Sequence, residues 1–146
     1  MGENPFYYCD VLETITIHPE NTHFKFENKV LFDVDNKILV SCSMTKTDET
    51  YTIPDGIVEI DYYAFYKNPY IKKVIIPGSV TLIQGNSFGA MSNIQTINYL
   101  GRTAPSCDET LLKNSNTGCV INIPTNYASS QFCSITVTDN KNLPAA

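Results

Sequence analysis

The sequence predicts a β-rich α/β solenoid built from one stack of parallel strands. The first observation is a repeat: residues 52–74 and 75–97 place apolar residues at the same slots, offset by 23 positions. Across that offset Pro54 matches Pro77, and Phe65 matches Phe88. The second is an Ile-Pro pair that recurs at 53–54, 76–77 and 123–124. A fixed period of this length is typical of repeats that bury each other's apolar faces by stacking.

Each repeat is expected to contribute one short strand, and neighbouring strands should be adjacent and parallel. The register places these strands at residues 14–17, 50–53, 73–76, 96–99 and 120–123. Side chains alternate between the two faces of a strand. The residues expected to point into the core are Ile15, Ile17, Tyr51, Ile53, Val74, Ile76, Ile97, Tyr99, Ile121 and Ile123. Phe65 and Phe88 occupy equivalent slots and should stack.

The whole chain, 1–146, is predicted to be a single domain. Residues 1–19 form a partial repeat, because Phe6, Leu12 and Ile15 have the spacing of a repeat's second half. Residues 20–50 form a longer unit with an inserted β-hairpin, since two β-rich runs flank the turn-forming pair Asp35-Asn36. The two 23-residue repeats occupy 51–97, a cysteine-bearing cap 98–133 and a tail 134–146.

The sequence also predicts how the two ends of the stack are covered. Ser106 stands three residues before Glu109 and ahead of two leucines, a capping-box pattern that predicts a short helix in the cap. Because the chain begins in mid-repeat, we interpret it as the C-terminal part of a longer protein. Its first strand should have an unpaired edge. We expect residues 3–8 to cover that edge, or a second copy to pair with it in a two-fold dimer.

The repeat pattern I-P-x-x-[IV]-x-x-I-x-x-x-x-F, with an aliphatic residue six positions after Phe65 and Phe88, resembles BspA-like leucine-rich repeats. That family occurs in surface proteins of oral bacteria and parasitic protists. The ending with Pro105-Ser106-Cys107 and Phe132-Cys133 resembles the C-terminal cap of the protist members. The resemblance implies a right-handed leucine-rich-repeat stack with parallel concave strands, few short helices and a role in cell adhesion or host interaction as a surface antigen.

The chain departs from the family pattern at two slots. Ala64-Phe65 keeps the family's Ala-Phe pair, whereas Ser87-Phe88 does not. A slot that is commonly Cys holds Cys9, then Asn68 and Met91, which indicates a core-facing filler.

Composition argues against several classes of partner. Ten basic and fifteen acidic residues give a net charge of −5, and no basic cluster exceeds Lys72-Lys73. Nucleic-acid binding needs a phosphate-neutralising patch and is therefore not expected. No stretch approaches the ~20 apolar residues of a membrane span, and the start lacks a signal-peptide pattern. We expect no cofactor and no membrane insertion in this part of the protein.

Five cysteines leave at least one unpaired. If the protein works outside the cell, the cap should hold one disulfide drawn from Cys107, Cys119 and Cys133. Cys107–Cys119 and Cys119–Cys133 are equally compatible with the sequence, and Cys9 and Cys42 should stay reduced. A zinc site is the less favoured alternative, because no C-x-x-C pair occurs.

We predict that the chain is not an enzyme. His18 and His23 are its only histidines, and we expect both to be solvated turn residues. The acidic residues Asp33, Asp35, Asp48 and Glu49 lack the alternating pattern of a calcium loop. We therefore predict neither catalytic nor metal-ligating residues.

The remaining candidate is the exposed, concave face of the strands. Strand alternation predicts two outward columns, one of Thr16, Thr52, Ile75, Asn98 and Asn122, the other of Thr14, Thr50, Lys73, Thr96 and Val120. Mostly small and uncharged, they suit either a flat hydrogen-bonding ligand surface or ordinary solvated strand. With the resemblance, they indicate a cell-surface or secreted module that binds a host or matrix protein or a glycan. An intracellular, cytoplasmic interaction scaffold is the alternative.

Overall fold

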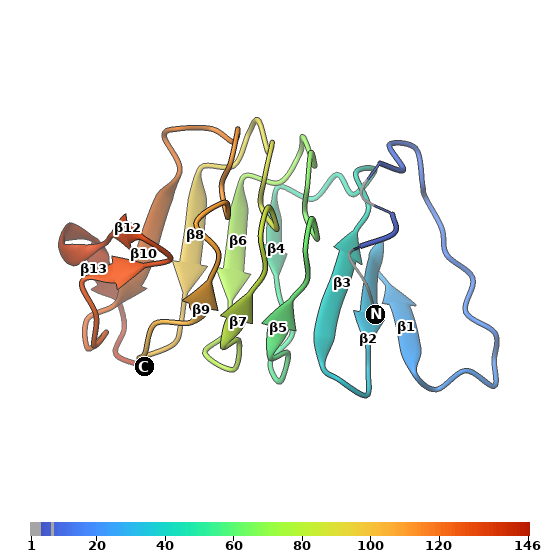
Figure 1. Cartoon of the computed structure of the whole chain (residues 1–146), viewed down its shortest axis with the longest axis horizontal. Coiled ribbons are helices and arrows are strands. Elements are labelled where there is room, and N and C mark those ends of the chain that lie inside the picture. Colours follow the sequence, from blue (N-terminus) through green and yellow to red (C-terminus); the bar gives the residue numbers. More distant parts are fainter. Residues whose placement is uncertain (1–3, 7) are drawn as a thin grey trace.

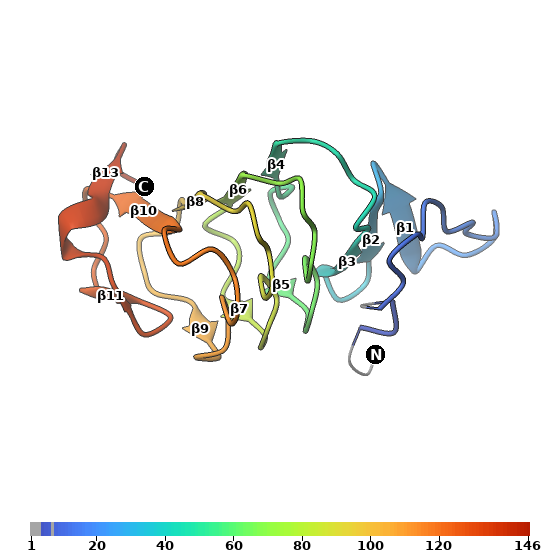
Figure 2. The ribbon, with the colours of Figure 1, turned by 90° about the horizontal axis from the view of Figure 1, so that it is seen from above.

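The computed structural model describes residues 4–6 and 8–146 as a parallel β-solenoid (Figure 1). Seen from above, two sheets run along opposite sides of the stack (Figure 2). Sheet 1 comprises β4 (Thr50–Thr52), β6 (Lys73–Ile76), β8 (Thr96–Tyr99), β10 (Val120–Pro124) and β13 (Lys141–Leu143). Sheet 2 comprises β1 (Phe24–Glu27), β2 (Val30–Asp33), β3 (Ile38–Cys42), β5 (Glu59–Ile60), β7 (Leu82–Ile83) and β9 (Ser106–Cys107).

Sheet 1 confirms the repeat register. Four of the five expected strands are present, and they pair in parallel in the order β4, β6, β8, β10. Tyr51 pairs with Val74 and Val74 with Ile97, so equivalent residues lie side by side. Each turn returns through a two-residue strand of sheet 2, so a repeat contributes two strands and not the one expected. The apolar slot at Ile60 and Ile83 recurs with the repeat and accounts for this second strand.

The core lies between the two sheets. All expected inward residues of β4, β6, β8 and β10 are buried there, together with both repeat phenylalanines. Asn68 and Met91 are fully buried as well, which confirms that their slot faces the core. Cys9, assigned to the same slot, is exposed, so that part of the prediction is wrong.

The predicted hairpin is present as β2 and β3, which pair antiparallel around residues 34–37. It is not an excursion from the stack, because β3 pairs in parallel with β5 and so begins sheet 2. β1 adds antiparallel to β2 at the far side. Val30 and Phe32 of β2 join the core, and the hairpin thereby covers its N-terminal end.

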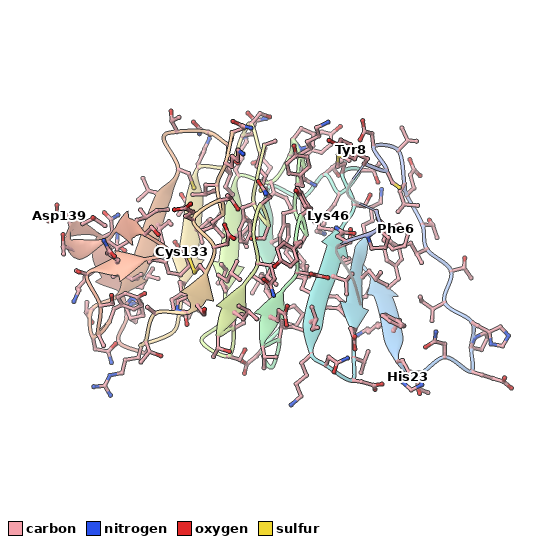
Figure 3. All side chains as sticks on the ribbon, in the orientation of Figure 1. Phe6, Tyr8, His23, Lys46, Cys133 and Asp139 are labelled. Atoms are coloured by element: carbon pink, nitrogen blue, oxygen red, sulfur yellow. A yellow bond between two sulfur atoms is a disulfide. The ribbon has the colours of Figure 1, made fainter. Side chains whose placement is uncertain are left out.

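The expected strand at 14–17 is absent, and these residues have no regular structure. The hairpin already covers the core's end, so Ile15 and Ile17 are only half-buried. Phe6, Leu12 and Ile15 instead lie with Phe26 around a small cavity on the outer face of the hairpin. Figure 3 shows Phe6 and Tyr8 on this N-terminal segment.

β4 is consequently the N-terminal edge strand of sheet 1. Within the expected covering segment 3–8, residues 3 and 7 lie outside the described residues. Asn4 does not reach β4: its amide donates to Ser41 Oγ and to the Tyr63 carbonyl, both at 3.1 Å.

The C-terminal end differs from expectation in two ways. The predicted short helix is absent, because Ser106 and Cys107 form β9 beside β7 and residues 109–114 form turns. The stack therefore continues for another full repeat. Residues 134–146, expected to be a tail, contribute a 3-10 helix (Thr138–Asn140) and β13, which pairs in parallel with β10. A two-stranded sheet, β11 (Gln131–Phe132) with β12 (Ile135–Thr136), lies between them in sequence.

Candidate binding surface on sheet 1

The outward columns of sheet 1 lie in register as the sequence predicts. Thr50, Lys73, Thr96 and Val120 are successive partners across β4, β6, β8 and β10. The second column follows the same order with Thr52, Ile75, Asn98 and Asn122. Their side chains face away from the core because the residues between them are buried in it.

Thr14 and Thr16 are not part of this surface. Both are exposed, but they lie in the irregular N-terminal segment and extend neither column. Assigning them to the columns was wrong, because the hairpin occupies the end of the stack where their strand was expected. The surface consists of the eight remaining column residues.

A ladder of asparagines crosses one end of this surface. The Asn122 amide donates to Asn98 Oδ1 at 2.9 Å, and the Asn142 amide donates to Asn122 Oδ1 at 2.8 Å. All donors in the ladder point toward β8. The chain of bonds ends at the Asn98 amide, whose two N–H groups make no hydrogen bond to the described residues. The ladder therefore fixes the side chains. Asn98, at its β8 end, is only 9% exposed, so the prediction of a fully exposed column is wrong at this position, where Asn122 of the next strand bonds to its side chain.

Asn142 adds a ninth residue to this surface, and sequence reasoning missed it. It lies in β13, whose pairing with β10 brings it beside Asn122. The segment 141–143 lacks the Ile-Pro pair and the apolar spacing of the repeats, so the register gave no signal for it.

The chemistry of the surface is mostly neutral. Lys73 is its one charged side chain, and Ile75 and Val120 add apolar patches between hydroxyl and amide groups. A cation, several hydrogen-bonding groups and two small apolar patches can contact a protein surface or a glycan. They cannot neutralise a row of phosphates.

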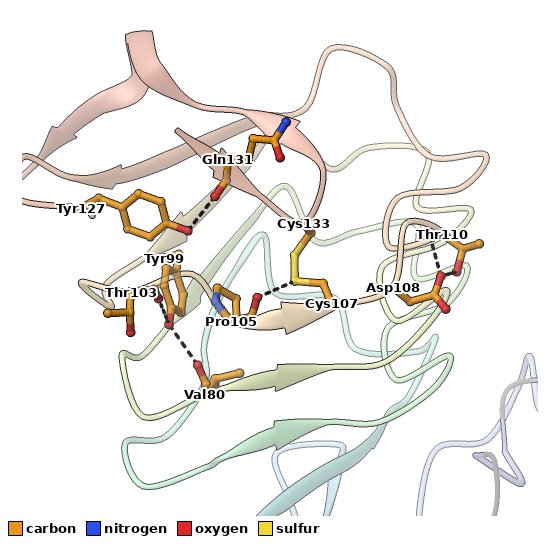
Figure 4. Close-up of a disulfide and its surroundings, with 10 residues drawn as sticks. All are labelled: Val80, Tyr99, Thr103, Pro105, Cys107, Asp108, Thr110, Tyr127, Gln131 and Cys133. Carbon is orange, nitrogen blue, oxygen red and sulfur yellow. Dashed lines mark hydrogen bonds between the residues drawn. A yellow bond between two sulfur atoms is a disulfide. The ribbon is translucent and has the colours of Figure 1, made fainter. Parts of the chain in front are cut away.

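A disulfide stabilises the C-terminal cap, residues 98–133. It joins Cys107 of β9 to Cys133 just after β11, with their Cα atoms 5.1 Å apart (Figure 4). The structure has one disulfide among the three cap cysteines and leaves Cys9 and Cys42 reduced, as expected, but the bridge joins neither of the two pairs considered from the sequence. Cys107 was expected in a helix, but in β9 its side chain reaches the returning β11–β12 segment, whereas Cys119 packs separately against the core.

The other three cysteines are free thiols that differ in their exposure to solvent. Cys9 is exposed, Cys42 is buried and Cys119 is half-buried. Burial raises the pKa of Cys42 to about 12 and that of Cys119 to about 11. Neither thiol is therefore an activated nucleophile near neutral pH.

The two histidines and several of the carboxylates make local ion pairs and hydrogen bonds. His23 is not only solvated, because it pairs with Asp35 and so ties the start of β1 to the β2–β3 turn. Figure 3 shows His23 just before β1. His18 accepts a hydrogen bond from the Glu20 backbone N–H at 3.3 Å. Asp48 pairs with Lys46 and Glu49 with Lys72, each at 2.7 Å. Among the described residues, no three His, Cys, Asp or Glu side chains gather where they could hold a metal ion.

Comparison with known proteins agrees with this geometry. The family model described as BspA type leucine-rich repeat region matches residues 1–135 in six copies. A leucine-rich repeat protein from Eubacterium ventriosum has a similar structure, with 24% identity and a TM-score of 0.74 over 94% of this chain. A leucine-rich cell surface protein from Faecalibacterium prausnitzii is 18% identical, with a TM-score of 0.57 over 88% of this chain.

These structural neighbours are longer proteins. The chain spans 37% of the Eubacterium protein and 45% of the Faecalibacterium protein. At these identities the likeness shows the fold. No curated protein matches the sequence. In the part of the chain that the structure describes, no helix combines the length and apolarity that a membrane crossing requires.

Proposed function

Because this chain belongs to the BspA-type leucine-rich repeat family, we propose that it is a non-enzymatic binding module of a cell-surface protein. The outer face of sheet 1 contacts the ligand, which is a host or matrix protein or a cell-surface glycan. Repeat proteins of this kind present extended surfaces rather than enclosed catalytic sites.

The observation that carries this proposal is the ordered asparagine ladder across β8, β10 and β13. Side chains on a solvated strand are usually free to change rotamer, and a ligand must then overcome the entropy of ordering them. Here Asn98 and Asn122 are already fixed by hydrogen bonds to each other and to Asn142. A preorganised surface loses less entropy on binding.

Two further observations support a position outside the cell. A disulfide between Cys107 and Cys133 is stable in oxidising compartments and rare in reducing ones. One structural neighbour is itself described as a cell surface protein. Labelling intact source cells with a membrane-impermeant amine reagent tests this location. Labelled chain on unbroken cells supports it, and labelling only after lysis favours the intracellular scaffold.

The experiment that tests binding is a screen of the purified chain against matrix proteins and a glycan array. The proposal predicts a saturable ligand whose binding is weakened by substitutions on sheet 1. A nucleophile-directed activity probe provides the opposing test. Selective labelling of one residue other than the exposed thiol Cys9 would indicate an enzyme.

A further inference from the structure

β4 has an edge with unsatisfied backbone groups. The Ile53 N–H donates to the Ile75 carbonyl, and the Glu49 carbonyl accepts from the Lys73 N–H, so residues of odd number point toward β6. Thr50 and Thr52 must then direct their N–H and C=O groups the opposite way. Those groups make no hydrogen bond to any described residue. An exposed strand edge of this kind is a template for pairing with another strand.

A groove continues from this edge where β4 ends. Its volume is about 290 Å³, and it is lined by Lys25 and Glu27 of β1, Phe32, Asp33 and Val34 of the hairpin, Lys37, and residues 54–57. Phe32 forms part of an apolar lining with Val34 and Ile57. The charged side chains around them are of both signs, and Lys25 and Glu27 neutralise each other at 2.8 Å.

The groove and the N-terminal segment lie on opposite faces of the hairpin. Phe26 lines the cavity under Phe6 and Leu12, whereas its neighbours Lys25 and Glu27 line the groove. Strand alternation accounts for this separation. The described residues of the N-terminal segment therefore leave the groove open.

The shape of the stack's N-terminal end limits what can bind at the β4 edge. β1, β2 and β3 extend sheet 2 beyond the position of β4 (Figure 1). Three strands add about 14 Å in the stacking direction. If two copies met at their β4 edges, both hairpins would occupy the same space. A single extended segment avoids this overlap, because it fits beside β4 with the hairpin beneath it.

We propose that the β4 edge and the adjoining groove bind an extended peptide segment of a partner protein by strand addition. The peptide pairs with Thr50 and Thr52 through its backbone. Its inward side chains are β-branched and aliphatic and pack toward Phe32 and Ile57, because β6 presents Val74 and Ile76 to the core from the other side of β4. This site is separate from the outer face of sheet 1.

The test uses a synthetic peptide with the sequence of residues 71–78, which contains the strand already known to pair with β4. When this peptide pairs in parallel with the unpaired edge of β4, the backbone N–H and C=O groups of its Val74 and Ile76 point toward β4. N-methylation at those two positions should abolish binding. N-methylation at Lys73 and Ile75, which face outward, should preserve it.

Two readouts decide the outcome. Amide hydrogen exchange of Thr50 and Thr52 should be fast in the free chain and at least tenfold slower with saturating peptide. Val34→Lys should weaken peptide binding at least tenfold, whereas Val120→Lys should not change it. These valines are similarly exposed, at 47% and 44%. Val34 lines the groove, and Val120 lies on the sheet 1 surface.

Three results would overturn the proposal. The first is no protection of Thr50 and Thr52 at millimolar peptide. The second is equal binding of both N-methylated peptides. The third is a dimer, seen by light scattering, that already protects the two amides in the free chain, because the occupant would then be a second copy.

Discussion

Phe65 and Phe88 stack face to face in the core, with ring centroids 4.9 Å apart and ring planes inclined by 8°. Both side chains are fully buried. The two residues occupy the same position in successive repeats. Their contact therefore follows directly from the 23-residue register. Substituting either residue by Ala should destabilise the fold by about 3–5 kcal/mol, measured by urea denaturation. Losses below about 1 kcal/mol at both sites would contradict the register.

Ser87 is buried beside this stack, and its hydroxyl has no hydrogen-bond partner in the described part of the chain. The equivalent residue of the preceding repeat is Ala64, which is also buried. Ser87→Ala should therefore raise the free energy of unfolding by about 1 kcal/mol, because it removes an unsatisfied polar group. Ala64→Ser is the matched control and should lower it by about 1–3 kcal/mol. Destabilisation by Ser87→Ala would mean that the hydroxyl has a partner.

Cys107 and Cys133 are separated by 26 residues. In the chain-entropy account, closing a loop of that length stabilises a fold by about 3.5 kcal/mol. Replacing both by Ser should lose about that amount. Mass spectrometry of alkylated protein should find three free thiols, with Cys9 alkylated fastest because it is exposed. Five free thiols in oxidised protein would contradict the bridge.

Lys46 is almost completely buried, at 1% side-chain exposure, and its ammonium lies 2.7 Å from Asp48 Oδ2. The ammonium is also 5.0 Å from the centroid of the Tyr51 ring. The hydrogen bond from Lys46, together with its charge, lowers the pKa of Asp48 below the usual 3.8. A lowered carboxyl pKa stabilises the fold above the unfolded pKa and stops doing so as pH falls through the folded value.

Asp48→Asn should therefore destabilise the chain at pH 7 by about 1–2 kcal/mol, less than for a fully buried pair because water reaches Asp48. The loss should shrink as pH falls below about 4, where the carboxyl of the unfolded chain becomes protonated, and should disappear once pH is below the lowered pKa of folded Asp48. Glu49→Gln is the control: its partner Lys72 is exposed, so its effect should stay below about 0.5 kcal/mol. Equal effects of the two substitutions at pH 7 would show that the Asp48 carboxylate does not stabilise the buried Lys46 ammonium.

The sequence predicted those parts of the fold that repeat. In the strands of sheet 1, as at Val74 and Ile97, the strand, its partner and its buried face were predicted correctly. The short strands of sheet 2 at Ile60 and Ile83 were not predicted, although that slot also recurs. The N-terminal segment was predicted wrongly because Ile15 and Ile17 have the repeat spacing, yet the hairpin residues Val30 and Phe32 compete for the same end of the core. Spacing alone does not show which of two apolar segments covers that end.

Non-repeating contacts account for the other differences. Cys107 meets Cys133 because β9 forms where a helix was predicted, and Asn142 reaches Asn122 because β13 pairs with β10. Both depend on the path of the chain after Pro124, where the 23-residue pattern ends. The outward columns of β4, β6, β8 and β10 could be predicted by residue, whereas the ladder that orders them could not.

The central claim, that the outer face of sheet 1 binds a ligand, is tested most directly by comparing two lysine substitutions on opposite sheets. Val120 lies in an outward column of sheet 1, and Ser106 is an exposed residue of β9 in sheet 2. For whichever matrix protein or glycan binds the chain, Val120→Lys should weaken the affinity at least tenfold, and Ser106→Lys should leave it within twofold. Thermal unfolding of both variants confirms that each is folded. Equal affinity of Val120→Lys and wild type, or a loss caused by Ser106→Lys instead, would contradict the account.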